Sequence, residues 1–145
     1  MKPKKITKEN FRRYGWIIEY PKKHLKSKKH NLFRIVLEEP AHGWRIAYLI
    51  VRDKAIDRLE HHPHSFESFE PVCGKSLLFV SSGKIPGRIE CFLLNRPIIL
   101  KKKIWHGIAA VGKEAEVKLT ENSRVGCVYY PLNRSEADRL KKFKE

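Results

Sequence analysis

The sequence predicts an all-β domain, built as a sandwich or barrel, that ends in a short basic helix. Short runs rich in β-branched and aromatic residues succeed one another through most of the chain. A proline or glycine recurs between these runs about every ten residues, a spacing typical of all-β sandwiches and barrels. Near the C-terminus, Ser135 is followed three residues later by Asp138, which resembles the capping box at the start of a helix.

The length and composition favour a single folded domain. The chain has 145 residues, close to the commonest domain size, and 41% of them are apolar and 10% aromatic. We expect three parts along it. These are a basic N-terminal tail over residues 1–10, a barrel domain over residues 11–132, and a basic helix or tail over residues 133–145.

The strand candidates follow in order along the barrel domain. The segment 16–20 is expected to be extended, and 53–60 fits one or two helical turns and a strand equally well. In the segment 44–52, the even-numbered residues from Trp44 to Ile50 lie on one face by the two-residue period of a strand. The other candidates share a high content of β-branched and aromatic residues. They are 31–38, 76–82, 89–95, 97–100, 108–113, 115–120 and 126–132.

The cysteines and the apolar segments predict the cellular location. No stretch approaches the ~20 apolar residues that a membrane span needs, and the N-terminus lacks the apolar core of a signal peptide. Cys73, Cys91 and Cys127 are odd in number, lie far apart and form no C-x-x-C pair. This is typical of reduced, buried thiols. We therefore expect a cytoplasmic protein that does not bind a membrane.

The charge of the chain is strongly positive. There are 31 Lys and Arg residues against 16 Asp and Glu, a formal net charge of +15. Such a charge attracts anions, whether nucleic acid, an anionic membrane surface or a carboxylate substrate. The basic residues form scattered blocks, however, and aromatic residues are not interleaved with them as a surface for single-stranded nucleic acid requires. These features favour a solvated basic surface and a small anionic ligand over nucleic acid.

Histidines and carboxylates crowd residues 59–71, which read LEHHPHSFESFEP. If this segment is extended, Glu60, His62 and His64 point to one face, with a bulge or a sheet edge at Pro63. Two histidines on one strand face are typical of a divalent-metal site. The alternative is that they are surface loop residues that titrate near neutral pH.

The remaining ligands of such a site are present elsewhere in the chain. Glu67 follows the histidine pair, and His106 lies between two other strand candidates. Imidazole nitrogens and a carboxylate suit Zn, Mn, Fe or Ni and leave coordination positions open. The pattern therefore predicts a divalent-metal or catalytic site.

Three segments carry a resemblance to a known family. FRRYGWII, from residue 11, resembles the F-x-x-[YF]-G-x-[VI]-I opening of the ureidoglycolate lyase family. EHHPHSFESFEPV, from residue 60, resembles its E-R-H-P-x-x-x-Q-x-F-x-P signature, and IWHGI, from residue 104, resembles its G-V-W-H stretch. The segments occur in the family's order and span about residues 11 to 130. The resemblance implies a cupin-type β-barrel, or jelly roll, and usually a homodimer.

The resemblance also implies an activity and a site. The family cleaves ureidoglycolate to glyoxylate and urea, and His62 and His106 would face each other inside the barrel. In cupins more generally, His62, His64, Glu67 and His106 would correspond to the metal-binding set. His64 stands where the lyases have an apolar residue, and Glu67 where they have glutamine. Ile104 replaces a glycine. The first two departures move the site toward a metal-binding cupin.

Three functions remain open from the sequence. In a lyase, His62, His106 and Glu67 are the catalytic candidates, because an imidazole with a pKa near the working pH can exchange the hydroxyl proton. A metal could assist, or a cation could hold the substrate carboxylate. The candidate cations are Arg45, Arg52 and Lys103. The alternatives are a non-enzymatic basic cupin module that binds a small anion or nucleic acid, and a metal-dependent cupin acting on a sugar or keto acid.

Overall fold

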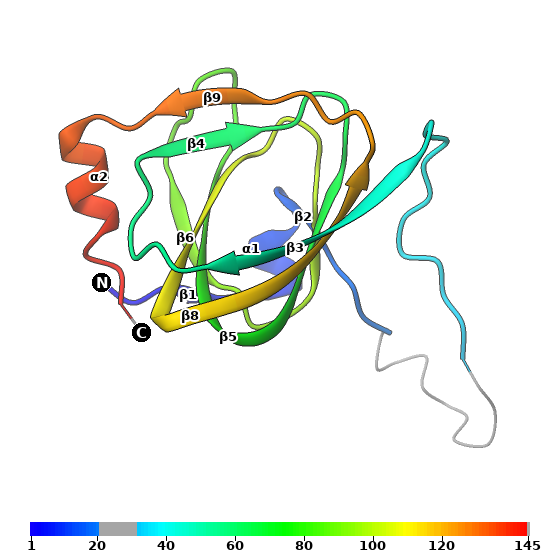
Figure 1. Cartoon of the computed structure of the whole chain (residues 1–145), viewed down its shortest axis with the longest axis horizontal. Coiled ribbons are helices and arrows are strands. Elements are labelled where there is room, and N and C mark those ends of the chain that lie inside the picture. The colour runs from blue at the N-terminus through cyan, green and yellow to red at the C-terminus, as the bar shows by residue number, and fades with distance from the viewer. Residues whose placement is uncertain (21–31, 145) are drawn as a thin grey trace.

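A computed structural model, which describes residues 1–20 and 32–144, places nine β-strands of this part of the chain in one sheet. The sheet curls into a barrel, and a C-terminal helix lies beside it (Figure 1). The predicted all-β barrel with a C-terminal helix is confirmed. The lysine-rich run 22–29 and Asn31 lie outside the described residues. The strands are β1 Lys4–Lys5, β2 Gly15–Ile17, β3 Trp44–Val51, β4 Arg58–His61, β5 Glu67–Ser81, β6 Glu90–Leu93, β7 Ile98–Leu100, β8 Trp105–Asn122 and β9 Val128–Pro131, and the helices are α1 Lys8–Phe11 and α2 Arg134–Leu140.

The two longest strands, β5 and β8, form the frame of the barrel. They pair antiparallel along their whole length, with shifts of register on either side of Gly74. Such bulges bend a strand and increase its twist. Gly74 has a φ of +70°, and a Cβ atom there would lie 2.4 Å from the carbonyl oxygen of Glu114, so glycine is required. The candidates 108–113 and 115–120 are therefore two halves of one bent strand.

Alternate residues of β5 pack into two separate cores. Leu78 and Val80 point into the barrel, whereas Leu77 and Phe79 point to its outer side, where Leu140 of α2 packs. Because the strand is buried on both faces, it reads as a continuous apolar run and not as an alternating one. The barrel core borders the candidate site, because the ring of its Phe69 lies 5.6 Å from that of His106, centroid to centroid.

The first ten residues, expected to form a basic tail, are part of the fold. β1 pairs in parallel with β6. α1 begins after Thr7, whose hydroxyl accepts a hydrogen bond from the backbone N–H of Asn10. Ile6 and Phe11 are buried in the barrel core. Ile6 within this segment and Phe11 directly after it therefore anchor it to the barrel.

Two expected elements differ from the structure. Residues 32–38 form no strand, because this segment pairs with no other and two of its β-forming residues, Phe33 and Ile35, stay exposed at 87% and 59%. α2 is capped by Asn133 and not by Ser135. The Asn133 side chain accepts from the N–H of Glu136, and the Glu136 carboxylate accepts from the N–H of Asn133, a complete capping box.

The three cysteines are free, but only one of them is buried. Cys91 lies in the core beneath α2, and burial raises the pKa of its thiol to about 12. Cys73 and Cys127 are exposed. The expectation of three buried thiols is therefore wrong for two positions, which lie where β5 bulges and just before β9 begins.

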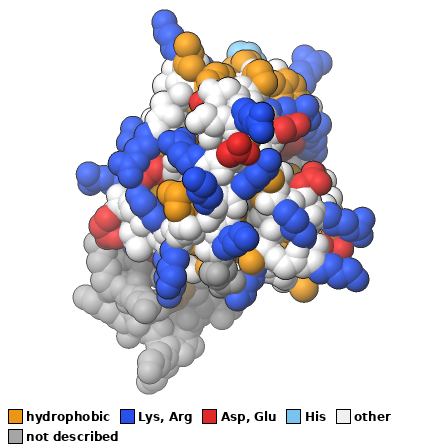
Figure 2. Space-filling view, turned by 90° about the vertical axis from the view of Figure 1, so that its left-hand side faces the viewer, with side chains coloured by type: hydrophobic (Ala, Val, Ile, Leu, Met, Phe, Trp, Pro, Cys, Tyr) orange, Lys and Arg blue, Asp and Glu red, His pale blue; other side chains and the backbone are white. Residues whose placement is uncertain are grey.

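The surface combines dispersed charge with one apolar stripe. On the face drawn in Figure 2, Lys and Arg side chains are scattered over the described surface, with Asp and Glu among them. The even-numbered residues of β3 from Trp44 to Ile50 share one face, as predicted, and that face is exposed. Its opposite face begins with Arg45. No helix in the described part of the chain is long and apolar enough to span a membrane.

Candidate functional site

Three strands bring two histidines and a glutamate together inside the barrel. Glu67 is the first residue of β5, and His106 is the second residue of β8. His62 follows directly after β4, and β4 pairs with β8 through Glu60 and His106. Of the segment 53–60, which fitted a helix and a strand equally well, the last three residues belong to this strand. The side chains of His62, Glu67 and His106, here called the His–Glu–His cluster, are 7%, 7% and 5% exposed.

The carboxylate of Glu67 lies between the two imidazole rings. Its Oε2 atom is 3.2 Å from Nε2 of His62 and 3.1 Å from Nε2 of His106. The ring centroids are 5.2 Å apart. The structure thus brings together all three residues that the sequence suggested as catalytic.

Two backbone carbonyls orient the rings. Nδ1 of His62 lies 2.9 Å from the carbonyl oxygen of Gly126, and Nδ1 of His106 lies 2.9 Å from that of Ile104. A carbonyl only accepts, so each Nδ1 carries the proton and donates it. Both Nε2 atoms are therefore turned toward Glu67, the arrangement in which carbonyl-bound histidines present a ligand atom to a metal.

Burial and opposite charge act against each other on these groups. Burial alone lowers the pKa of His62, but the hydrogen bond and charge of Glu67 outweigh it and raise that pKa to about 9. Burial likewise lowers the pKa of His106, and the charge of Glu67 reverses this and raises it. Burial raises the pKa of Glu67, whereas the two histidines lower it to about 2. Glu67 therefore favours the protonated form of both histidines, and the histidines favour the ionised form of Glu67.

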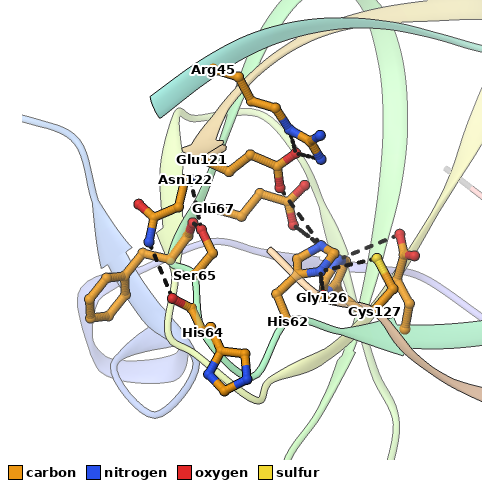
Figure 3. Close-up of polar contacts among 12 residues, drawn as sticks. Arg45, His62, His64, Ser65, Glu67, Glu121, Asn122, Gly126 and Cys127 are labelled. Carbon is orange, nitrogen blue, oxygen red and sulfur yellow. Dashed lines mark hydrogen bonds and ion pairs between the residues drawn. The ribbon is translucent and has the colours of Figure 1, made fainter. Parts of the chain in front are cut away.

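A fourth buried side chain, Glu121 of β8, was not identified from the sequence. It pairs in register with Glu67 on β5 and with Arg45 on β3, so the three form one row across the sheet. Oε2 of Glu121 lies 3.9 Å from Nε2 of His62, and Oε1 accepts from Arg45 at 2.8 Å (Figure 3). The signal was the alternation in β8, because Glu121 continues the inward series of Val117 and every second residue.

His64 lies outside the cluster, which corrects the expected face of Glu60, His62 and His64. β4 ends at His61 and the chain bends at Pro63, so the two-residue period does not continue to His64. The His64 side chain is exposed and points away from Glu67 and Glu121 (Figure 3).

The three cations suggested for the substrate carboxylate lie in different places. Arg45 reaches the site but is paired with Glu121. Arg52 is exposed and pairs with Glu114 at 2.9 Å, outside the site. The Lys103 side chain is also exposed. Lys103 contacts the site only through its backbone, since its N–H donates to the carbonyl oxygen of His62 at 2.9 Å.

Cavities flank the site. One, of about 350 Å³, is lined by Glu67 and Glu121 among others. Another, of about 330 Å³, is lined by His106, Glu60 and Arg58. Sequence reasoning did not identify Arg58, because an exposed arginine at the start of a strand has no distinguishing pattern.

The residues present fit a divalent metal ion. Among the described residues, Nε2 of His106 and Oε2 of Glu67 have no hydrogen-bond partner of suitable geometry, in spite of their short separation. Buried polar atoms without a partner are costly, and a cation would satisfy both. There are two groups of three residues in which the potential ligand atoms all lie within 4.8 Å of one another. They are Glu60, His62 and His106, and His62, Glu67 and Glu121.

The barrel and its enclosed histidines and glutamates define an all-β protein of the cupin type. No family model matches the chain. A dTDP sugar isomerase from Desulfovibrio desulfuricans G20 is structurally similar over 74% of this chain and 76% of that one, with a TM-score of 0.57 and 19% identity. The capsular polysaccharide assembling protein CapF from Staphylococcus aureus is similar over 63% of this chain and 27% of that one, with a TM-score of 0.52 and 12% identity. These two similarities concern the fold.

One curated protein is similar to the chain in sequence. The chain is 31% identical over 78 residues to the ureidoglycolate lyase of Rhizobium etli (strain CIAT 652). The match covers 50% of this chain and 47% of that lyase, so it spans about half of the curated relative. It agrees with the resemblance noted in the sequence.

Proposed function

We propose that the protein is a cupin-fold lyase that cleaves a small α-hydroxy acid, and that its substrate is ureidoglycolate. The observation that carries the proposal is the buried His–Glu–His cluster, flanked by cavities, in a chain partly similar to a ureidoglycolate lyase. Cleavage yields glyoxylate and urea and involves no oxidation or reduction. One proton leaves the carbinol oxygen and one is gained by the departing urea nitrogen.

His62, Glu67 and His106 would hold a divalent metal, either Ni, Zn, Mn or Fe. Bound there, the metal supplies positive charge that offsets the substrate carboxylate and lowers the pKa of the substrate hydroxyl group. The chain's own part is to keep the ligand atoms in place. The carbonyl oxygens of Gly126 and Ile104 hold the two rings with Nε2 directed at Glu67.

Two residues of the 330 Å³ cavity are suited to act on the substrate. The guanidinium of Arg58 lies over the ring of Tyr129 at 5.0 Å and forms no ion pair with any described residue, so it can bind the substrate carboxylate through two hydrogen bonds. The Glu60 carboxylate is 39% exposed and 3.9 Å from Nε2 of His106. It accepts the hydroxyl proton and returns it to the urea nitrogen as the carbon–nitrogen bond breaks.

The test is an assay of urea and glyoxylate released from ureidoglycolate by the purified chain, supplied with each of the four metals in turn. We expect the two products in equal amounts, and Arg58→Gln should raise KM about tenfold or more because a bidentate carboxylate contact is lost. Arg52→Gln is the matched control, since Arg52 is exposed and lies outside the site. No release by metal-loaded protein would reject this substrate. The homodimer, the cytoplasmic location and the preference for a small anion over nucleic acid stay predictions.

A further inference from the structure

We propose that Glu121, and not His64, supplies the fourth protein ligand of the metal site. The inference rests on the metal named in the proposed function and extends it to a residue outside the expected set. It makes the site one of two histidines and two glutamates. His62, His106 and Glu67 remain the other three.

The first observation is an unpartnered carboxylate oxygen in the interior. The side chain of Glu121 is only 6% exposed. Its Oε2 atom is buried and has no hydrogen-bond partner among the described residues. Leaving a buried carboxylate oxygen without a partner is costly, so this atom is expected to have one in the functional protein. Oε2 of Glu121 faces the His–Glu–His cluster and lies 3.9 Å from Nε2 of His62.

The second observation is the way in which Arg45 holds the other oxygen. Nε and Nη2 of Arg45 approach Oε1 of Glu121 at 2.8 Å and 2.7 Å. Because both contacts fall on Oε1, the carboxylate is fixed while Oε2 stays free. The row of Arg45, Glu121 and Glu67 across three strands therefore works as a support that directs Oε2 to the cluster (Figure 3). Arg45 is a positioning residue in this arrangement.

The third observation is the balance of charge. Glu67 and Glu121 are directly opposite each other on paired strands, and both are buried. Two buried carboxylates repel; Arg45 offsets the charge of Glu121, whereas Glu67 faces the two histidines. A divalent cation bound by two neutral imidazoles and two carboxylates is neutralised. Carboxylate oxygens suit Mn²⁺ well among the divalent ions that imidazole also binds.

The local chain direction excludes His64 from the same role. Its side chain is exposed, and its backbone carbonyl is held by the side-chain amide of Asn122 at 3.2 Å. Asn122 is the residue next to Glu121. The contact therefore attaches the turn at His64 to the end of β8 while the imidazole stays outside.

The experiment is a titration of the metal-free full chain with Mn²⁺. Binding is monitored by calorimetry and by the electron paramagnetic resonance signal of the free ion. We expect Glu121→Gln to weaken Mn²⁺ binding by at least ~10-fold. The affinity of His64→Ala for Mn²⁺ should stay within about twofold of that of the natural protein. The inference is overturned if Glu121→Gln binds as the natural protein does, or if His64→Ala carries the loss instead.

A second measurement needs no substitution in the site. Electron spin echo modulation of the Cu²⁺-loaded natural protein counts coordinated imidazoles, and we expect two, with the same count in His64→Ala. Three imidazoles, one of them lost in His64→Ala, would overturn the inference even if Glu121→Gln failed to fold. The lyase assay is judged separately. If the protein binds no metal but releases urea, the ligand assignment is rejected and the lyase activity is retained. If it binds metal through Glu121 but releases no urea, the ligand assignment is retained and the lyase activity is rejected.

Discussion

Oε2 of Glu67 lies 3.1 Å from Nε2 of His106, although the two residues come from different strands. The contact is buried, and Ile104 and Gly126 hold the surrounding imidazoles from behind. A carboxylate in this position joins both histidines into one unit. Its removal should therefore affect the whole site and not a single contact.

Glu67→Gln should reduce metal affinity by at least ~100-fold, because a charged ligand shared by two histidines becomes a neutral amide. The measurement is a titration of each metal-free variant with the metal ion. Glu70→Gln is the matched control, since Glu70 lies on the same strand and pairs with Lys118 away from the cluster. Equal losses in both variants would contradict a specific role for Glu67.

Glu90 of β6 binds Lys4 and Tyr14 of the N-terminal segment, and this contact should make the stability of the protein depend on pH. Burial raises the pKa of Glu90, but hydrogen bonds from Lys4 and Tyr14 outweigh it and lower that pKa below its ordinary value. A lowered pKa means that the stabilisation is present above the unfolded-state pKa of about 4.3 and is lost as the pH falls through the folded-state value.

We therefore expect Glu90→Gln to lower the free energy of unfolding by about 1 kcal/mol at pH 7, as for a hydrogen-bonded charge at the surface. The difference from the natural protein should shrink as the pH falls below about 4. Urea unfolding at a series of pH values measures it. A difference that stays constant down to pH 3 would show that Glu90 acts by packing and not by charge.

Gly15→Ala should destabilise the barrel by about 3 kcal/mol. A Cβ atom at Gly15 would lie 1.7 Å from the carbonyl oxygen of Ile99, in the pairing of β2 with β7. Gly87→Ala is the control, because the nearest atom to a Cβ there is 3.9 Å away. Urea unfolding of both variants provides the comparison, and equal stability of the two would mean that β2 is not held against β7 as described.

Leu140→Ala should cost about 3 kcal/mol of unfolding free energy, because Leu140 is 3% exposed in the core beneath α2 and its loss leaves a cavity. Leu140 lines neither of the two cavities at the site, so kcat at 25 °C should stay within about twofold. Exposed Lys141→Ala, one residue further, should change little. Thermal unfolding and the lyase assay give the two readouts. A large fall in kcat for folded Leu140→Ala would show that the two cores are coupled.

Much of the architecture was predictable from residue patterns. The apolar runs located most strands, because a strand buried on one or both faces must be apolar at those positions. They did not show that 108–113 and 115–120 are one strand, since the bend depends on how β8 pairs with β5 around Gly74. They also failed for 32–38, where β-forming residues have no partner strand.

The sequence by itself determined the barrel class and pointed to His62, Glu67 and His106 as one site, because these residue types occur at suitable spacings and resemble a known family. Only the tertiary structure decided that His64 turns outward and that Glu121 turns inward. The physical reason is that the end of a strand and the register of its pairing set the direction of each side chain. Both depend on contacts between segments that are distant along the chain.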